Sequence, residues 1–162
     1  PTMPEYPPTV AECLDDSMRF RVSTLNALRM YRSLKPWRGD DRERERKLRV
    51  LHEALCIIYR VVVPLVVECG GGDSGGSSYN GINRTITLRG RLSVVTYLHE
   101  FAHALGKLDE REACRWSINL FRRVFPREFD RLAHDGHTLR RQPARGRGNA
   151  SKGSASRNVG SR

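Results

Sequence analysis

The sequence predicts a single α+β domain that is mostly helical and contains a small mixed sheet. Apolar residues recur at steps of three and four in several segments, as amphipathic helices require, whereas two short segments rich in β-branched residues are typical of strands. A chain of 162 residues is long enough for one buried core and too short for two. We therefore expect the domain to span 19–139, between a flexible lead-in at 1–18 and a disordered basic tail at 140–162.

Two helices are expected in the first part of the domain. The first covers 24–34, with Ser23 as its N-cap, and stops before Pro36. The second follows Asp40 or Asp41, either of which is a suitable cap. Its apolar residues alternate at steps of three and four, which indicates one buried face. That face consists of Leu48, Leu51, Leu55, Ile58 and Val62.

Strands are expected at 65–69 and 83–88, on either side of a flexible glycine-rich loop at 70–78. In the second strand two threonines alternate with Ile86 and Leu88, which indicates one buried face. The loop lacks the Lys-Ser/Thr pair of phosphate-binding loops, so a nucleotide site is not expected there.

A third helix is expected over 94–105, after Gly90 ends the preceding strand and Ser93 provides an N-cap. Its inward face consists of Val95, Leu98, Ala102 and Leu105. A fourth helix is expected from Glu110 to about Phe125, where Pro126 interrupts the pattern. Its apolar residues are Trp116, Leu120, Phe121, Val124 and Phe125.

The third helix contains the sequence His99-Glu100-Phe101-Ala102-His103. Two histidines four positions apart lie one above the other on a helix, where both imidazoles can bind one tetrahedral Zn²⁺. Glu100 follows the first histidine, and a carboxylate beside a zinc-bound water can take its proton. The spacing therefore predicts a zinc hydrolase site, with His99 and His103 as ligands and Glu100 as general base.

A catalytic zinc usually has three protein ligands and a water, so a third ligand is needed. The candidates are Asp109, Glu110 and Glu112. Asp109 and Glu112 have the D-x-x-E spacing of a capping box, which would engage both with backbone amides of the fourth helix. Glu110 would then be the free carboxylate, so we prefer Glu110, followed by Asp109 and then Glu112.

These residues carry a family resemblance. His99-Glu100-x-x-His103, followed by Glu110-x-x-Ala113-x-x-Trp116-Ser117, resembles the zincin domain of the ImmA/IrrE family, whose pattern is HExxH and then E-x-x-A-x-x-F-A. The resemblance covers about residues 44–125. It implies a zincin-like metallopeptidase core, zinc ligands at both histidines and Glu110, Glu100 as general base, and substrates that are often repressor proteins. The gap before Glu110 is shorter than in that family, and Trp-Ser replaces Phe-Ala.

A second resemblance concerns the same stretch. His99-Glu100-x-x-His103-x-x-Gly106-x-x-Asp109 is similar to the metzincin motif, in which an aspartate is the third ligand. No methionine follows Met30, however, so the Met-turn of that clan is missing. We therefore prefer the resemblance to the ImmA/IrrE family over the resemblance to the metzincins.

The net charge of +11 is concentrated in two stretches. Residues 140–162 hold seven basic and no acidic residues, and residues 19–49 hold eleven basic against four acidic ones. The expected partner is a protein or peptide substrate, with a weak nucleic-acid contact through 140–162. The alternative function is a non-catalytic, zinc-stabilised regulatory or nucleic-acid-binding module that uses these basic flanks. A helical protein with an accidental HExxH and no metal is the third interpretation.

The four cysteines are scattered, without a C-x-x-C pair, and no signal segment precedes the domain. Both observations favour reduced thiols and a cytoplasmic location. The longest apolar run, 61–67, contains Pro64 and is far too short to span a bilayer.

Overall fold

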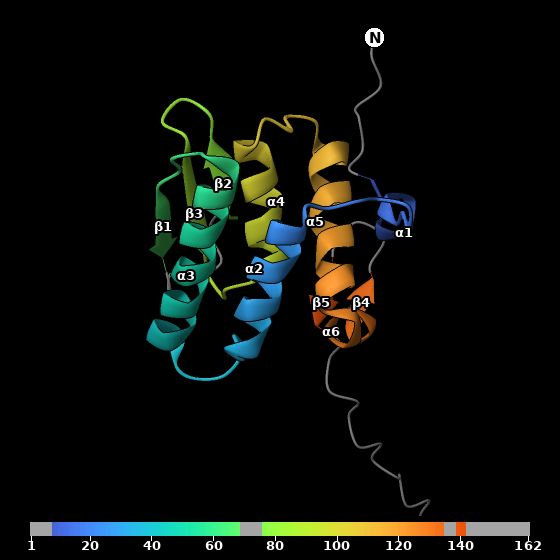
Figure 1. The fold of residues 1–162 in the computed structure, drawn as a ribbon, viewed down its shortest axis with the longest axis horizontal. Helices are drawn as coiled ribbons and strands as arrows, with labels where there is room; N and C mark the ends of the chain where they lie inside the picture. Colours follow the sequence, from blue (N-terminus) through green and yellow to red (C-terminus); the bar gives the residue numbers. More distant parts are fainter. Residues whose placement is uncertain (1–7, 69–75, 135–138, 142–162) are drawn as a thin grey trace, which may run out of the picture.

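A computed structural model describes residues 8–68, 76–134 and 139–141 of the chain. The fold is mostly helical, with a mixed three-stranded sheet at one side, so the α+β prediction is confirmed (Figure 1). In the described part of the chain, no helix has the length and apolar character needed to cross a membrane. The proline-rich opening, most of the glycine-rich loop and the tail beyond Arg141 lie outside the described residues, so the predictions made for them stay predictions.

Helices α2 (Val22–Ser33) and α3 (Asp41–Tyr59) pack against each other, close to their expected positions. Asp40 caps α3 by accepting a 2.9 Å hydrogen bond from the backbone N–H of Glu43. The helix ends where Arg60 adopts the left-handed conformation, at φ 53°. Val62 therefore lies outside the helix and is 86% exposed, so its expected place on the buried face is wrong.

The three strands of the sheet lie in the order β1 (Leu65–Glu68), β3 (Thr85–Arg89), β2 (Ser78–Asn80). Strand β1 is parallel to β3, and β2 is antiparallel to it. Ile86 and Leu88 of β3 are buried, as the alternating pattern predicted. Strands β1 and β2 form the two edges of this sheet, and β3 is its centre.

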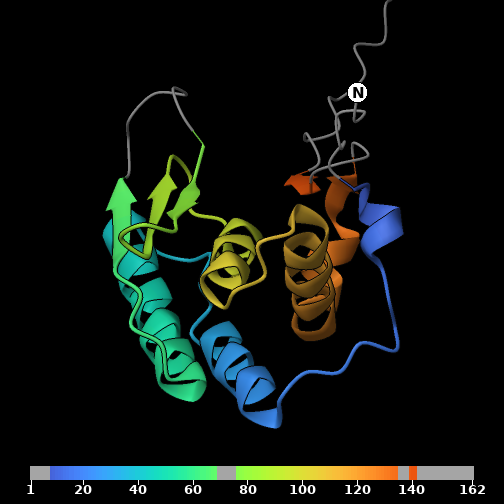
Figure 2. The same ribbon diagram turned by 90° about the horizontal axis from the view of Figure 1, so that it is seen from above.

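Helix α4 (Val94–Ala104) lies between the sheet and helix α5 (Glu110–Val124), which Figure 2 shows from above. Ser93 caps α4 through a hydrogen bond from the N–H of Thr96, as expected. Leu98 and Ala102 are buried, and Tyr97 and Phe101 are buried as well. Because the sheet and α5 cover opposite sides of α4, its buried surface is wider than the single predicted stripe.

The start of the described chain differs from the expected flexible lead-in. Thr9 and Glu12 form a capping box around the short helix α1 (Val10–Cys13), and Val10 and Cys13 are buried in the core against α5. The Thr9-x-x-Glu12 spacing is a capping signal that we overlooked in the sequence. Residues 9–15 therefore pack with the domain that we expected to begin at residue 19.

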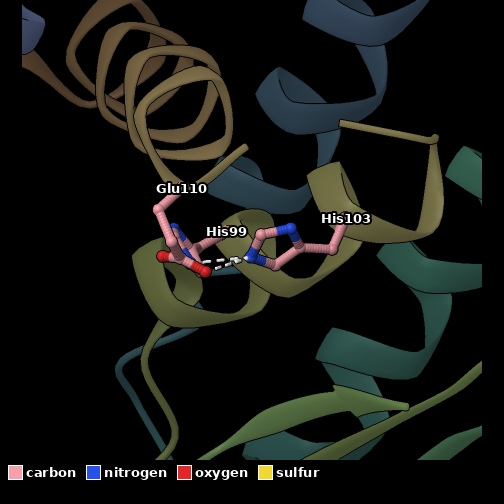
Figure 3. A group of neighbouring side chains, drawn as sticks. All are labelled: His99, His103 and Glu110. Atoms are coloured by element: carbon pink, nitrogen blue, oxygen red, sulfur yellow. Dashed lines mark hydrogen bonds and ion pairs between the residues drawn. The ribbon is translucent and has the colours of Figure 1, made fainter. Parts of the chain in front are cut away.

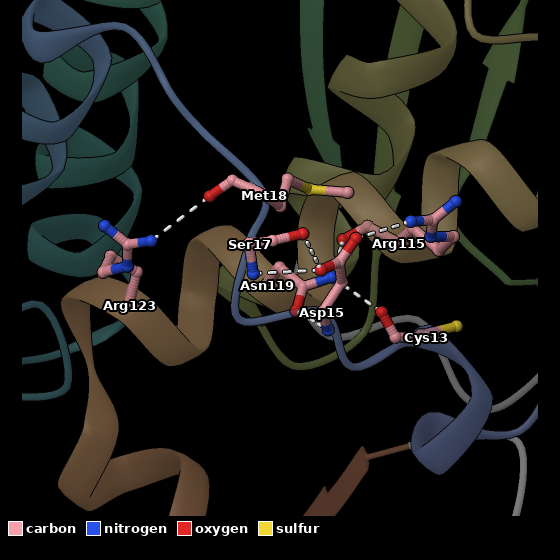
Figure 4. Close-up of polar contacts among 7 residues, drawn as sticks. All are labelled: Cys13, Asp15, Ser17, Met18, Arg115, Asn119 and Arg123. Carbon is pink, nitrogen blue, oxygen red and sulfur yellow. Dashed lines mark hydrogen bonds and ion pairs between the residues drawn. The ribbon is translucent and has the colours of Figure 1, made fainter.

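Asn119 of α5 holds the segment that follows α1 (Figure 4). Its amide nitrogen donates 2.7 Å hydrogen bonds to the carbonyls of Cys13 and Arg115, and its amide oxygen accepts one of 2.8 Å from the N–H of Asp15. The Asp15 carboxylate forms a 2.8 Å ion pair with the Arg115 guanidinium. The lead-in is thus attached along the side of α5.

The chain after α5 forms helix α6 (Pro126–Asp130) and a hairpin of strands β4 (Leu132–His134) and β5 (Leu139–Arg141). Arg140 and Arg141, which we expected in a disordered tail, belong to β5. Apolar residues of α5 join those of α2, α3, α4 and β3 in one core. This core fixes α4 and α5 side by side.

Candidate metal centre

Helix α4 places His99 and His103 one turn apart on the face that meets α5. Their Nε2 atoms lie 3.2 Å from each other, and their rings are nearly perpendicular. The side chains are 20% and 12% exposed, so both rings are partly shielded from solvent. The i,i+4 spacing thus brings two nitrogen ligands to one point, as the sequence predicted.

A tight turn brings the beginning of α5 back over this point. Gly106 adopts φ +94°, a conformation that favours glycine, and the N–H of Lys107 donates to the carbonyl of Ala102. Ala113 is fully buried, and its small side chain lets α5 pack closely against α4. Glu110, at the first position of α5, is therefore held next to the two histidines.

The Glu110 carboxylate contacts both imidazoles (Figure 3). Oε2 lies 3.1 Å from Nε2 of His99, and Oε1 lies 2.9 Å from Nε2 of His103. One ligand atom from each residue fits within 4.8 Å of the others. Two imidazoles and a carboxylate are a donor set of catalytic zinc sites, in which ligand atoms about 2.0–2.1 Å from the ion are about 3.3–3.4 Å apart. The three side chains could therefore hold a metal ion.

The two other acids are placed differently. Asp109 is the N-cap of α5, where its carboxylate accepts a 2.9 Å hydrogen bond from the N–H of Arg111. The expected partner was the N–H of Glu112, one position further on. Glu112 is exposed in the first turn of α5 and does not join the cluster of His99, His103 and Glu110. Among the three candidates, the geometry favours Glu110 as third ligand.

The Nδ1 atoms of the two rings point away from the carboxylate and have different partners. Nδ1 of His103 lies 2.7 Å from the carbonyl oxygen of Lys107. Nδ1 of His99 lies 3.6 Å from Sγ of Cys114, which is one helical turn after Glu110 on α5. We did not assign Cys114 to the site from the sequence. Its position four residues after Glu110, on the same face of one helix, was the signal that could have indicated it. Burial raises the pKa of this thiol to about 12, with a smaller contribution from the nearby Cys13.

Glu100 faces the sheet side of the site and is only 8% exposed. Burial raises the pKa of its carboxyl to about 7, and the charge of Glu110 adds to this increase. His103 and the backbone N–H of Tyr79 in β2 act in the opposite direction because they stabilise the carboxylate. A buried carboxyl beside the histidines, with a pKa near neutrality, is suited to proton transfer.

Burial lowers the pKa of His99, and this effect outweighs the opposing charge of Glu110. A neutral imidazole is the form that binds a metal ion, because the protonated ring has no free lone pair. The electrostatics of the site therefore favour the ligand form of His99.

His52-Glu53 repeats the first two residues of HExxH, with Cys56 in the place of the second histidine, and His52 has a structural role. Nδ1 of the buried His52 lies 2.7 Å from the Tyr97 hydroxyl, and Nε2 lies 2.5 Å from the carbonyl oxygen of Val63. Both ring nitrogens are thus satisfied by oxygen atoms inside the core. Burial also lowers the pKa of this ring, so His52 is a neutral link between α3, α4 and the chain before β1.

In comparisons with known proteins, no family model, no curated protein and no solved structure matches this chain. The assignment of a function therefore depends on the geometry of the site and on the motif that it contains.

Proposed function

We propose that this chain is a zinc-dependent metallopeptidase with a zincin-like core, acting on a protein or peptide substrate. The observation that carries the proposal is the convergence of His99, His103 and Glu110, in which one carboxylate lies within 3.1 Å of two imidazole nitrogens. The resemblance of the motif to the ImmA/IrrE family supports the same assignment. The thiols of Cys13, Cys56 and Cys114 are free, which supports a cytoplasmic location.

The two histidines and Glu110 would hold the ion, which when bound supplies an activated water and polarises the substrate carbonyl. Glu100 would be the general base, taking a proton from the attacking water and passing it to the leaving amine. The N–H of Tyr79 orients the Glu100 carboxylate from the sheet side. His103 is fixed from behind by the Lys107 carbonyl, so its Nε2 remains directed at the centre of the site.

The substrate backbone would bind along β2. The sequence pattern suggested that Thr85–Leu88 would flank the cleft as an edge strand. These residues belong to β3, the centre of the sheet, and β2 is the edge next to α4. The backbone N–H of Tyr79 in β2 binds the Glu100 carboxylate, so this edge of the sheet lies next to the proposed general base. Because Glu100 already binds the N–H of Tyr79, an extended peptide beside β2 would be held mainly through its own N–H donors, with little demand on its sequence.

The replacement Glu100→Gln tests the mechanism. The amide keeps the shape of the side chain but cannot accept the proton, so zinc content should stay unchanged while kcat/KM falls by about 10²-fold or more. The probe is a mixed library of quenched fluorescent peptides, with cleavage read by fluorescence and by mass spectrometry. Glu53→Gln is the matched control. Glu53 also follows a histidine on a helix, but it is exposed and does not belong to the cluster of His99, His103 and Glu110.

Cleavage by Glu100→Gln at the wild-type rate would remove Glu100 from the mechanism. Zinc bound by the wild-type protein without any cleavage of the library would instead favour the alternative function, a zinc-stabilised regulatory module.

A further inference from the structure

We propose that Cys114 is a positioning residue for the metal centre, because its sulfur accepts a hydrogen bond from Nδ1–H of His99 and directs Nε2 at the ion. This inference depends on the proposed zinc site and names a residue that the HExxH motif does not include. The observation is the 3.6 Å contact between Sγ and Nδ1, formed across the packed helices α4 and α5.

The proton on Nδ1 of His99 needs a hydrogen-bond acceptor when Nε2 binds a metal ion. Nε2 of each histidine faces the Glu110 carboxylate, so Nε2 is the atom available to a metal ion. A neutral imidazole that binds metal through Nε2 carries its proton on Nδ1, and this proton needs an acceptor. His103 has the carbonyl oxygen of Lys107 in that position. For His99, the Cys114 sulfur is the Nδ1 partner among the residues that the structure describes.

The position of Cys114 also excludes a role as a ligand of the same ion. Sγ lies at Nδ1 of His99, whereas Glu110 and His103 lie at Nε2, on the other side of the ring. Because Glu110 and Cys114 are four residues apart on α5, one helix face supplies the carboxylate in front of the ring and the thiol behind it. Sulfur is a weak hydrogen-bond acceptor, so the hydrogen bond to Nδ1 of His99 is weaker than the one between Nδ1 of His103 and the Lys107 carbonyl.

A second histidine and cysteine pair in the chain provides the matched control. Cys56 is also partly buried, and its Sγ lies 3.5 Å from Nε2 of His52, four residues away on α3. His52 has oxygen partners at both nitrogens and is not in the metal cluster. Removing the Cys56 thiol therefore changes a similar contact without affecting the site.

The experiment measures the zinc affinity of the full chain by competition with a chromophoric chelator. Cys114→Ala removes the acceptor and should weaken zinc binding about 10-fold, the lower end of the effect of losing such a partner. Cys114→Ser keeps an acceptor and should recover part of that loss, while Cys56→Ala should bind zinc as the wild type does. In Co²⁺-loaded protein, the visible absorption bands should shift for Cys114→Ala and not for Cys56→Ala.

Wild-type affinity and an unshifted Co²⁺ spectrum in Cys114→Ala would overturn the inference while leaving the proposed function intact. An equal loss in Cys114→Ala and Cys56→Ala would also overturn it, because the effect would then be a general loosening of the core. Absence of zinc binding by the wild-type chain would overturn both proposals. If Cys114→Ala does not fold, Cys114→Val replaces it, because valine has a similar volume and no acceptor; wild-type zinc affinity and an unshifted spectrum in that variant would overturn the inference.

Discussion

At the scale of single residues, the site brings two histidines and two glutamates together, and the charge of each group affects the protonation of its neighbours. Glu110 is 62% exposed and faces two histidines, so its carboxylate closes the site from the solvent side. Glu100 is buried on the sheet side, where ionisation is costly. The spacing of the two histidines could be read from the sequence because local helix geometry fixes it. The preference for Glu110 came instead from the expected capping roles of Asp109 and Glu112, because the contact of Glu110 with the histidines joins α5 to α4. The contact of Cys114 with His99 crosses two helices, so no local pattern specifies it.

Glu100 should make the stability of the metal-free protein depend on pH. Its pKa is raised from 4.5 to about 7 in the folded chain, so the folded state binds an extra proton between these values. Below pH 4.5 Glu100 is protonated in both states and does not lower the free energy of unfolding. Above pH 7 it is ionised in both states, and the buried carboxylate lowers the free energy of unfolding by its full amount. Glu100→Gln removes the ionisation, so its stability relative to the wild type should rise by about 1–2 kcal/mol over that window, allowing for partial solvation.

The measurement is urea denaturation of both proteins with a chelator present, at pH 4.5, 6 and 8. A difference between the variant and the wild type that stays constant over this range would show that Glu100 is not held in a buried environment.

At the scale of elements, caps and turns were the features most visible in the sequence. Ser93 caps α4 as expected, and Asp40, one of two candidates, caps α3. Ser23, the expected cap of the first helix, lies inside α2, whose N-cap is Arg21. Strand β2 escaped detection because it has three residues and adjoins a glycine-rich stretch, so its pairing with β3 is set by tertiary contacts. The same applies to α1, whose four residues are stabilised by packing on α5.

The attachment of α1 to α5 should depend on Asn119, which is 5% exposed. Asn119→Ala removes three hydrogen bonds and leaves the buried carbonyl of Cys13 without its donor. We expect a loss of about 2–3 kcal/mol in the free energy of unfolding, measured by urea denaturation. The control is Asn26→Ala on the exposed side of α2, which should cost less than about 0.5 kcal/mol.

If Asn119→Ala were as stable as Asn26→Ala, the start of the chain would not be part of the cooperative fold. The inclusion of residues 9–15 in the domain would then be incorrect.

At the scale of the whole molecule, several residues of the basic stretch 19–49 bind other parts of the fold. The Arg32 guanidinium donates a 2.7 Å hydrogen bond to the carbonyl of Val124, and that of Arg49 donates one of 3.0 Å to the carbonyl of Leu65. Lys47 donates to the carbonyls of Lys35 and Arg38 between α2 and α3. Arg21 lies over the ring of Tyr59, 4.6 Å from its centre. These contacts leave fewer cations free for a nucleic acid.

The sequence could not reveal this use of the basic residues, because charge counts do not show which cations contact carbonyl groups of distant elements. The periodicity of the apolar residues and the β-branched segments predicted the fold class, and the helix periodicity also predicted which segments enclose the site. The arrangement of α4 between the sheet and α5 required the structure, since it arises from long-range packing of Tyr97 and Phe101.

The most direct test of the account is the zinc-to-protein ratio of the purified full chain after zinc loading and desalting, measured by elemental analysis. We expect about one zinc per chain in the wild type and in Glu112→Ala, and much less in His103→Ala and Glu110→Ala, because each loses one of three ligands. A wild-type chain without bound zinc, or a His103→Ala variant that retains the full amount, would contradict the proposed metal centre.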